Sequence, residues 1–585
     1  MLEERRSQAA AAVVDEAAPA APVASAYRDP VTWAVAVAAF GAYLAISLFR
    51  LLQLTPTSWD LGIFTEYVKQ LANLRAPVVD VRGPGFNLLG DHFQVIVALI
   101  APFFRVFPSP ATLLVAQALL VAVSVFPVTQ AAVALLGRGT GRAIGVAYAF
   151  SWGLQQMVDF DFHEVAFAVP LLAFSLSALV RGRTRAAVAW AMPLVFVKED
   201  QGFTVAAIGL LMLLAGARPD AAGWRGWRGR IHGSVPGGLF LIGWGLAWSL
   251  VAIAVIIPHF NAHHRYFYWS DGGVVGAGPP FSVTGLIRQG FYAWPVKLQT
   301  VVMLLLPTAF IALGSPVALV AVPSLALRFI TTNNSYWGTQ WHYNATVMPV
   351  LFIAAADTLA RWRAMRAGEP DADDPRPSAR AGPAAGDSAP AAAGGAGPAA
   401  GDSAPAAGGA APAAGGAAPA AGGAAPAAAS GAWPVTGFVP PASYLPPAGS
   451  MWPRLRAAAT RHGAAMMLAV TVALVFQFPL GNLWHGTTYE IGPHATAADA
   501  AMAQVPDGAT VQTTLSLLAP LAARTDTFWI GNPGNPLTQY LVFDGLNSGY
   551  SPAPANVPAF IHQLYPKAGY VEIYVRDHVY VFRRA

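Results

Sequence analysis

The sequence predicts an all-α polytopic transmembrane bundle of about 11 helices, followed by a small extracytoplasmic α/β domain. Three observations predict the bundle and the domain. Of the 585 residues, 55% are hydrophobic and only 11% are charged, whereas soluble domains carry about 25% charged residues. Long apolar runs recur along most of the chain. The segment after the last run instead alternates apolar and polar residues in short stretches, which is typical of strands.

The composition excludes several classes of protein. The chain has no Cys, which excludes disulfides, thiolate metal sites and cysteine nucleophiles. The net charge of +5 is small for this length, so nucleic acid is not an expected partner. The sequence has no P-loop, HExxH or GxSxG signature and no convincing dinucleotide-binding one.

The chain begins with an Ala-rich segment and then a first apolar run. Residues 1–30 lack the short apolar stretch and cleavage site of a signal peptide, so they are predicted to form a cytoplasmic tail. Residues 31–54 are long enough to span a membrane. We interpret this run as a retained signal anchor.

Ten further apolar runs follow the first. A spanning helix needs about 20 apolar residues, and several runs are shorter than that. A transmembrane domain is predicted over residues 31–366 and a last transmembrane helix within 453–483. The predicted spans are residues 31–54, 111–136, 143–158, 165–180, 186–197, 202–215, 237–257, 296–313, 316–330, 345–359 and 464–483.

The Arg-rich loops predict the orientation, because cytoplasmic loops carry the excess of Lys and Arg. With a cytoplasmic N-terminus, all of these loops lie on the cytoplasmic side and the C-terminus is extracytoplasmic. The predicted location is the plasma (inner) membrane. Residues 93–107 are marginal in length for a span and contain Pro102 and Arg105. A span there would place the Arg-rich loops on different sides of the membrane, so these residues are predicted to lie flat on the outer surface. The loops contain Arg138 and Arg142; Arg181, Arg183 and Arg185; Arg218, Arg225, Arg228 and Arg230; and Arg361, Arg363 and Arg366.

The first outer loop is predicted to hold two juxtamembrane helices. Leu61, Phe64, Val68 and Leu71 recur at helical spacing with polar residues on the other faces, which indicates an amphipathic helix at the membrane interface. A Gly/Pro turn at residues 82–86 separates it from the second surface segment.

The last two predicted segments are a linker and a domain. Residues 367–452 repeat Ala, Pro and Gly and are predicted to be a disordered cytoplasmic linker, interpreted as a tolerated insertion rather than a docking site. Residues 484–585 are predicted to fold as the α/β domain. Its expected strands are near 505–511 and 538–543, with a hairpin at 570–582.

Four clusters of ionisable residues are predicted to lie on the outer side, where such groups warrant a functional hypothesis. The first is Asp60 with Glu66. Asp60 is interpreted as an N-cap of the following helix or as a catalytic base, and the two roles are compatible. The second is Asp91 with His92. Asp91 is interpreted as a cap of the second surface helix. The alternative is that His92 binds phosphate or orients an acid.

The third cluster is Asp159, Asp161, His163 and Glu164. Oxygen-rich ligation of this kind suits Mg²⁺ or Mn²⁺, and the alternative is a solvated loop. The fourth cluster is Lys198, Glu199 and Asp200. Lys198 is predicted to hold a lipid phosphate, or else to neutralise one of the two aspartates of the third cluster.

Two outer loops are rich in aromatic residues and His. Residues 259–269 include His263, His264 and Arg265, and residues 333–344 include His342. Such loops form an aromatic belt at the membrane interface, or alternatively a wall that binds a sugar or headgroup. In the second interpretation, Arg265 or Arg328 contacts a phosphate.

Taken together, four motifs resemble a bacterial and archaeal membrane protein family of unknown function, DUF2079. The motifs are Ser-Trp-Asp-Leu-Gly-Ile-Phe at 58–64, Gly-Asp-His-Phe at 90–93, Asp-Phe-His-Glu at 161–164 and Lys-Glu-Asp at 198–200. The resemblance covers roughly residues 58–359 and, more weakly, the tail from 505. The layout is similar to that of the GT-C glycosyltransferases, such as protein mannosyltransferases and lipid A aminoarabinose transferases.

The resemblance implies transfer of a sugar from a polyprenyl-phosphate donor to an extracytoplasmic envelope acceptor. It implies that Asp60 is the catalytic base and that Lys198 contacts the lipid phosphate, with Asp159 or Asp161 near further acids. The chain departs from many such transferases by having Trp-Asp where they have Asp-Glu or Asp-Asp. The predicted substrate-binding residues are Glu66, Asp91, His92, Lys198, Glu199, Asp200, His263, His264, Arg265, Arg328 and His342.

Two other functions remain as alternatives. A transporter or flippase for a lipid-linked precursor would have repeated halves and polar groups at mid-membrane, and the sequence shows no internal repeat in its apolar part. A non-catalytic membrane scaffold would tolerate neutralisation of Asp60 and Lys198.

Overall fold

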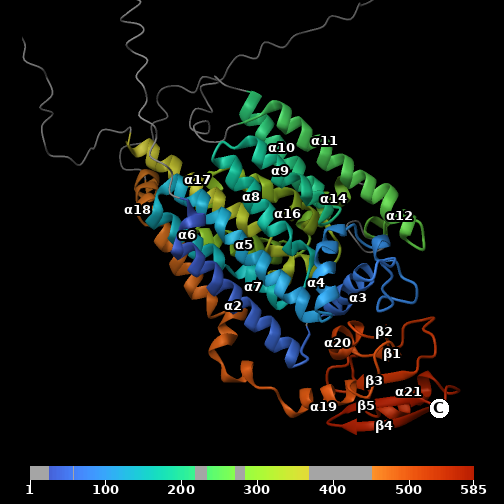
Figure 1. Cartoon of the computed structure of the whole chain (residues 1–585). Helices are drawn as coiled ribbons and strands as arrows, with labels where there is room; N and C mark the ends of the chain where they lie inside the picture. Colours follow the sequence, from blue (N-terminus) through green and yellow to red (C-terminus); the bar gives the residue numbers. More distant parts are fainter. Residues whose placement is uncertain (1–24, 57, 218–232, 271–282, 368–450) are drawn as a thin grey trace, which may run out of the picture. The chain divides into compact units, whose positions relative to one another are not determined.

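The structure is a computed structural model that describes residues 25–56, 58–217, 233–270, 283–367 and 451–585 (Figure 1). The described residues from 25 to 367 and from 452 onward belong to one compact unit. Nearly all of the predicted N-terminal tail and of the predicted linker, and the Arg-rich loop at 218–230, lie outside the described residues.

Five helices in the described residues are long and apolar enough to cross a membrane. They are Pro30–Leu52, Pro110–Leu136, Val235–Phe260, His342–Arg366 and Pro453–Val475. In Figure 1 these correspond to α2 (Pro30–Leu52), α5 (Pro110–Leu136), α11 (Val235–Val251) continuing to α12 (Ile257–Phe260), α17 (Val347–Ala367) and α18 (Met451–Val475). Shorter apolar helices include α8 (Ala168–Val180), α9 (Thr184–Ala191), α10 (Gln201–Ala217) and α16 (Val322–Ile330).

Every predicted span overlaps a helical segment, but three of the spans are broken. In the span at 464–483, α18 ends at Val475 and a 3₁₀ segment follows at Pro479–Trp484. The span at 143–158 consists of α6 (Arg138–Ala149) and α7 (Trp152–Asp159), and the one at 296–313 consists of α15 (Trp294–Leu305) and short 3₁₀ turns. Pro307 lies in the first of these turns, where its missing N–H and fixed φ disfavour a continuous helix. The last helix begins earlier than the predicted 464, because its first turns carry Arg residues that mask the apolar pattern.

Small residues allow two of the helices that flank the site to pack closely. A Cβ at Gly202 of α10 would lie 2.2 Å from the carbonyl oxygen of Gly245 of α11, and a Cβ at Gly209 would lie 2.7 Å from that of Gly238. Close backbone approach of this kind is common between membrane helices. It fixes the position of the loop at 198–200, which immediately precedes α10.

The first loop contains the predicted helix, α3 (Asp60–Ala72), followed by a 3₁₀ segment (Val95–Ile100) and α4 (Ala101–Val106). The amphipathic pattern therefore predicted the helix correctly. However, α3 packs against α4, α5 and the C-terminal helix α20 (Leu518–Ala522). Glu66, expected on a polar face, is only 1% exposed. Protein therefore covers α3 on more faces than is expected of an amphipathic helix that lies at the membrane interface.

The C-terminal segment folds around a five-stranded sheet with strand order β2-β1-β3-β5-β4. β1 (Thr510–Thr513) pairs in parallel with β2 (Asp526–Trp529) and β3 (Tyr540–Asp544), and β4 (Tyr570–Arg576) and β5 (Val579–Arg584) form the predicted hairpin. The helices are α19 (Pro493–Met502), α20 and α21 (Val557–Leu564). The strand expected at 538–543 is confirmed, whereas β2 was not predicted because it has only four residues.

Short helices α13 (Phe267–Ser270) and α14 (Val283–Phe291) flank the gap at 271–282.

Candidate functional site

The structure brings the first, third and fourth polar clusters into contact with one another. Asp60 lies at the start of α3, with its Oδ2 3.5 Å from Nε2 of His163. Glu164, the next residue after His163, accepts a hydrogen bond from Nζ of Lys198 at 2.9 Å. Two neighbouring residues of the third cluster therefore join the first cluster to the fourth.

The second cluster is joined to the fourth by Glu199, which is buried. Nδ1 of His92 lies 2.7 Å from Oε1 of Glu199, and the hydroxyl of Tyr266 donates to the same oxygen at 3.0 Å. The hydroxyl of Tyr268 donates to Asp91, and its ring stacks on His92 with centroids 4.6 Å apart. Segments far apart in sequence thus form one connected polar network.

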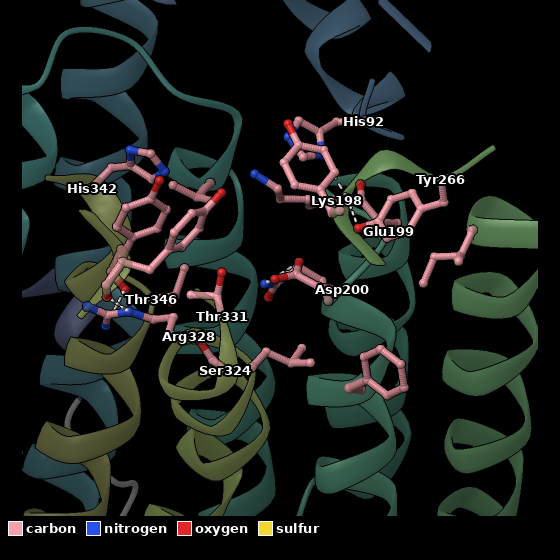
Figure 2. Close-up of a pocket in the computed structure, with 18 residues that line it drawn as sticks. His92, Lys198, Glu199, Asp200, Tyr266, Ser324, Arg328, Thr331, His342 and Thr346 are labelled. Carbon is pink, nitrogen blue, oxygen red and sulfur yellow. Dashed lines mark hydrogen bonds and ion pairs between the residues drawn. The ribbon is translucent and has the colours of Figure 1, made fainter. Parts of the chain in front are cut away.

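This network borders a pocket with about 870 Å³ of empty space, including its open mouth. Figure 2 shows Lys198, Glu199 and Tyr266 near His92, with His342 and Arg328 on the opposite side and Asp200 between the two groups. The lining residues are His92, Val165, Lys198, Glu199, Asp200, Gln201, Phe203, Ile253, Tyr266, Tyr268, Ser324, Leu327, Arg328, Thr331, Tyr336, His342, Tyr343 and Thr346.

One part of the pocket wall is apolar. Phe203 of α10, Leu327 of α16 and Ile253, which follows α11, all line the pocket. These segments belong to the apolar helices of the bundle. The pocket therefore presents charged groups together with apolar surface, as a site for an amphiphilic molecule requires.

Asp60 is not among the lining residues but is linked to the pocket through two stacked imidazoles. The ring of His163 stacks on that of His342 with centroids 3.8 Å apart, and His342 lines the pocket. The side chain of Asp60 is 35% exposed, whereas that of His163 is 4% exposed. The Asp60 carboxylate is therefore partly open to solvent, whereas the His163 ring is enclosed by protein.

Charges around the pocket shift the pKa values of the groups outside the spanning helices. Burial raises the pKa of Asp60, but the hydrogen bond and charge of His163 outweigh it and lower the value to about 2. Burial likewise opposes ionisation of Glu199, yet nearby His92 lowers its pKa to about 2. Burial lowers the pKa of Lys198, but Glu164 and Glu199 raise it well above its usual range. All three groups are therefore ionised at neutral pH.

Asp200 behaves differently from its neighbour Glu199. Burial raises its pKa above the ordinary value, only partly offset by the positive charge of Lys198. Oδ1 of Asp200 accepts a hydrogen bond from the Gln201 side chain at 3.2 Å. This carboxyl is thus easier to protonate than the other acids of the pocket.

The predicted capping roles of Asp60 and Asp91 are wrong. Asp60 is the first residue of α3 rather than its N-cap, and its Oδ2 accepts a hydrogen bond from the hydroxyl of Ser58. Asp91 precedes the 3₁₀ segment, whose N-cap is Gln94, and it pairs with Arg82 at 3.3 Å. Both carboxylates face partners from other segments instead.

The four predicted metal ligands do not converge. Oδ1 of Asp159 lies 2.5 Å from Nη1 of Arg50, while His163 faces Asp60 and Glu164 faces Lys198. The backbone of Asp161 is left-handed at φ +62°, which turns it away from the alternating geometry of an extended ligand loop. Among the described residues, no three His, Asp or Glu side chains group as metal ligands do. The residues present do not fit the predicted Mg²⁺ or Mn²⁺. Lys198 also does not pair with Asp159 or Asp161, the predicted alternative, because it pairs with Glu164.

Several other predicted binding residues lie away from the pocket or are engaged elsewhere. His263, His264 and Arg265 are exposed and do not line the pocket. Arg328 lines it, but its guanidinium donates to the carbonyls of Tyr336, Gly338 and Tyr343 and to the Asn344 side chain. Arg328 therefore holds the loop that carries His342. Few of its N–H groups are left for the expected contact with a phosphate. Glu66 binds the backbone N–H of Val81 in the first loop instead of the pocket.

Four tyrosines of the pocket were not predicted individually. Tyr266 and Tyr268 lie two positions apart, just after the histidines of the first aromatic loop. Tyr336 and Tyr343 each supply a backbone carbonyl that accepts a hydrogen bond from Arg328. The sequence placed them in aromatic loops, but an interfacial belt and a ligand wall share the same composition. Only the fold distinguishes these two roles.

The C-terminal domain touches the first loop next to Asp60. The ring of Trp59 stacks on Trp529 at the end of β2, with centroids 4.4 Å apart. Lys69 of α3 donates to the carbonyl of Thr525 at 2.6 Å. A Cβ at Gly62 would lie 3.0 Å from Cβ of Leu518, so the helices approach closely there. The domain therefore supports the segment that carries Asp60.

Comparison with known proteins shows a family and a solved structure that this chain resembles. A family model described as a predicted membrane protein (DUF2079) matches residues 50–370, more than half of the chain. The crystal structure of ArnT from Cupriavidus metallidurans bound to undecaprenyl phosphate has a TM-score of 0.49 and 13% sequence identity, covering 96% of this chain and 98% of that chain. No curated protein matches the sequence.

Proposed function

This chain belongs to the DUF2079 family of predicted membrane proteins, and we propose that it is a glycosyltransferase that takes its sugar from a polyprenyl-phosphate donor. The observation that carries the proposal is the network joining Asp60 to Lys198 through His163 and Glu164. The network connects a partly exposed carboxylate to the largely buried cation that lines the pocket. The acceptor in this proposal is an extracytoplasmic envelope molecule.

Lys198 is the group that meets the donor phosphate. One of its three N–H bonds goes to Glu164, so two remain for phosphate oxygens. The apolar part of the wall suits the first units of a polyprenyl chain. A preorganised ammonium group in a largely buried site stabilises the negative charge that develops on a leaving phosphate.

The acids beside Lys198 have a different role in the proposal. Glu199 is held by His92, Tyr266 and the backbone N–H of Phe93. Within the described residues, the carboxylate of Asp200 accepts a hydrogen bond only from the Gln201 side chain. It is therefore available to accept hydrogen bonds from sugar hydroxyls.

In the proposed reaction the bond between the anomeric carbon and the phosphate oxygen breaks, and its electron pair stays with the phosphate. The acceptor oxygen or nitrogen forms the new bond to the anomeric carbon, and its proton passes to Asp60. His163 lies behind Asp60 and keeps it ionised and oriented.

The test uses the purified full chain in liposomes that contain polyprenyl-phosphate-linked sugars extracted from the host membrane. Release of polyprenyl phosphate is followed by mass spectrometry, alongside lipid binding. Asp60→Asn is expected to lose transfer by about 100-fold or more and to bind the lipid normally. Asp507→Asn removes a carboxylate that is 81% exposed on the C-terminal domain and should be unaffected.

Two results would contradict the proposal. Lipid binding with no sugar release in any preparation would favour the scaffold. Movement of intact lipid-linked sugar between leaflets, unchanged in Asp60→Asn, would favour a transporter.

A further inference from the structure

A second pocket lies at the other end of α2 from Asp60 and is independent of the proposed function. It is formed by the start of α2, the end of α5 and the start of α6 (Figure 1). With 23 residues at 1.5 Å each, α2 is about 35 Å long, so the two pockets lie at opposite ends of a spanning helix. The lining residues are Ser25, Ala26, Arg28, Asp29, Pro30, Val133, Arg138 and Arg142.

The pocket carries an excess of positive charge. Nε and Nη2 of Arg142 donate to the two carboxylate oxygens of Asp29 at 3.0 and 2.6 Å, so this pair is neutral. Arg28 and Arg138 are exposed, and neither side chain forms an ion pair or hydrogen bond with any described residue. Two positive charges therefore remain without a partner in the described part of the chain.

A helix N-terminus adds to the attraction for an anion. α6 has 12 residues and begins at Arg138, directly after Gly137, so its first N–H groups and the positive end of its dipole lie at the pocket. The N-terminus of α2 is already occupied by Asp29, which also accepts a hydrogen bond from Thr32. A further anion can therefore bind at the part of the pocket formed by the first turn of α6.

Exposed aromatic residues place the pocket at the level of lipid headgroups. Tyr27 is 41% exposed and Trp33 is 53% exposed, and the indole N–H of Trp33 donates to the carbonyl of Tyr27 at 3.0 Å. Trp and Tyr with this exposure at the end of a spanning helix favour the membrane–water interface. Pro30 and Val133 supply apolar lining below the arginines.

We propose that this pocket binds the headgroup of an anionic phospholipid, with its phosphate between Arg28, Arg138 and the first turn of α6. Basic pockets between membrane helices on the cytoplasmic side are known to take such headgroups. The predicted orientation puts the pocket in the cytoplasmic leaflet. The lipid would brace α2, α5 and α6 against one another.

The experiment measures lipid binding to the purified full chain by native mass spectrometry, using phosphatidylglycerol and phosphatidylcholine as probes. Phosphatidylglycerol is expected to bind more tightly than phosphatidylcholine. The double variant Arg28→Gln/Arg138→Gln should weaken phosphatidylglycerol binding by about tenfold or more. The matched control, Arg185→Gln/Arg366→Gln, removes two other exposed arginines outside the pocket and should retain the affinity.

Three outcomes would overturn the proposal. Equal binding of the two lipids would remove the role of charge. An equal loss in the control variant would mean that diffuse surface charge, not the pocket, attracts the lipid. Binding of soluble glycerol phosphate as tightly as the lipid would identify a free-phosphate site. Because all four arginines are exposed, their replacement should leave folding intact, which the thermal unfolding midpoint checks.

Discussion

Glu66 is a carboxylate enclosed by protein in the first loop. Oε2 accepts a hydrogen bond from the Val81 N–H at 3.0 Å, while Oε1 has no hydrogen-bond partner among the residues that the structure describes. Burial raises the pKa of Glu66 to about 8, with the hydrogen bond and Lys69 only partly opposing it. The folded protein therefore keeps Glu66 protonated at a pH where the unfolded chain does not.

The first prediction concerns the pH dependence of stability. Between about pH 4.5 and 8 the unfolded state releases the Glu66 proton and the folded state retains it, so stability falls as pH rises, by a few kcal/mol at most. Glu66→Gln, whose amide oxygen can still accept from Val81, should unfold at a higher temperature than wild type at pH 8 and at a similar temperature at pH 5. Glu572→Gln, at an exposed position of β4, is the control. The same pH slope in wild type and Glu66→Gln would contradict this account.

At the level of single residues, the sequence identified the polar groups of the network but not their partners. Asp60, His92, Lys198 and the acids beside them stood out because charged groups near membrane spans are costly. Their pairing depends on where each backbone turns. His163 and Glu164 are adjacent in sequence and reach Asp60 and Lys198 respectively, which no spacing rule indicates. The predicted metal site failed for the same reason.

At the level of elements, the pocket depends on close contact between the first loop and the segment after α12. A Cβ at Gly90 would lie 2.6 Å from the carbonyl carbon and oxygen of Phe260. Asn261 also donates to the Gly90 carbonyl at 2.8 Å. The loop that carries Asp91 and His92 is thereby held beside the loop that carries the tyrosines.

The second prediction follows from this contact. In Gly90→Ala the new methyl group clashes with main-chain atoms of Phe260 and Asn261, so the two backbone segments must move apart. This variant should be less stable than wild type by about 1–3 kcal/mol and should bind polyprenyl phosphate more weakly. Gly41→Ala, where a Cβ meets nothing within 4 Å, should do neither. Thermal unfolding and lipid binding of the two variants are compared with those of wild type. Identical behaviour of Gly90→Ala and Gly41→Ala would disprove the role of this contact.

Apolar periodicity predicted the helical segments well and their ends less well. α2 and α5 lie close to the predicted spans because both runs are long and uninterrupted. α18 begins 13 residues before the predicted residue 464, at Met451, since Arg residues interrupt its hydropathy but not its helical backbone. β2 escaped prediction because a four-residue strand has too few alternations to stand out.

At the scale of the whole molecule, the C-terminal domain and the first loop act as one assembly around Asp60. Trp529 stacks on Trp59, Asn532 donates to the carbonyl of Val81, and Lys69 binds the carbonyl of Thr525. The sequence predicted both parts separately but gave no sign of this contact, because residues more than 400 positions apart form it.

The third prediction tests this contact directly. Trp529→Ala removes the stack on Trp59, so backbone amides of residues 58–72 should exchange hydrogen faster than in wild type. Trp529→Phe, which keeps an aromatic ring, should exchange at close to the wild-type rate. Peptides from the sheet serve as the internal check on domain folding. Unchanged exchange of residues 58–72 in a folded Trp529→Ala protein would show that the domain does not brace the loop.

The central claim is that the pocket around Lys198 holds a lipid phosphate, and equilibrium binding of a polyprenyl phosphate to the purified full chain tests it most directly. Lys198→Gln should weaken binding by at least about tenfold, because a charge-assisted contact to phosphate is lost, while Lys198→Arg keeps part of the affinity. Lys567→Gln, at an exposed position of the C-terminal domain, should bind as wild type does. Wild-type affinity in a folded Lys198→Gln protein would contradict the account.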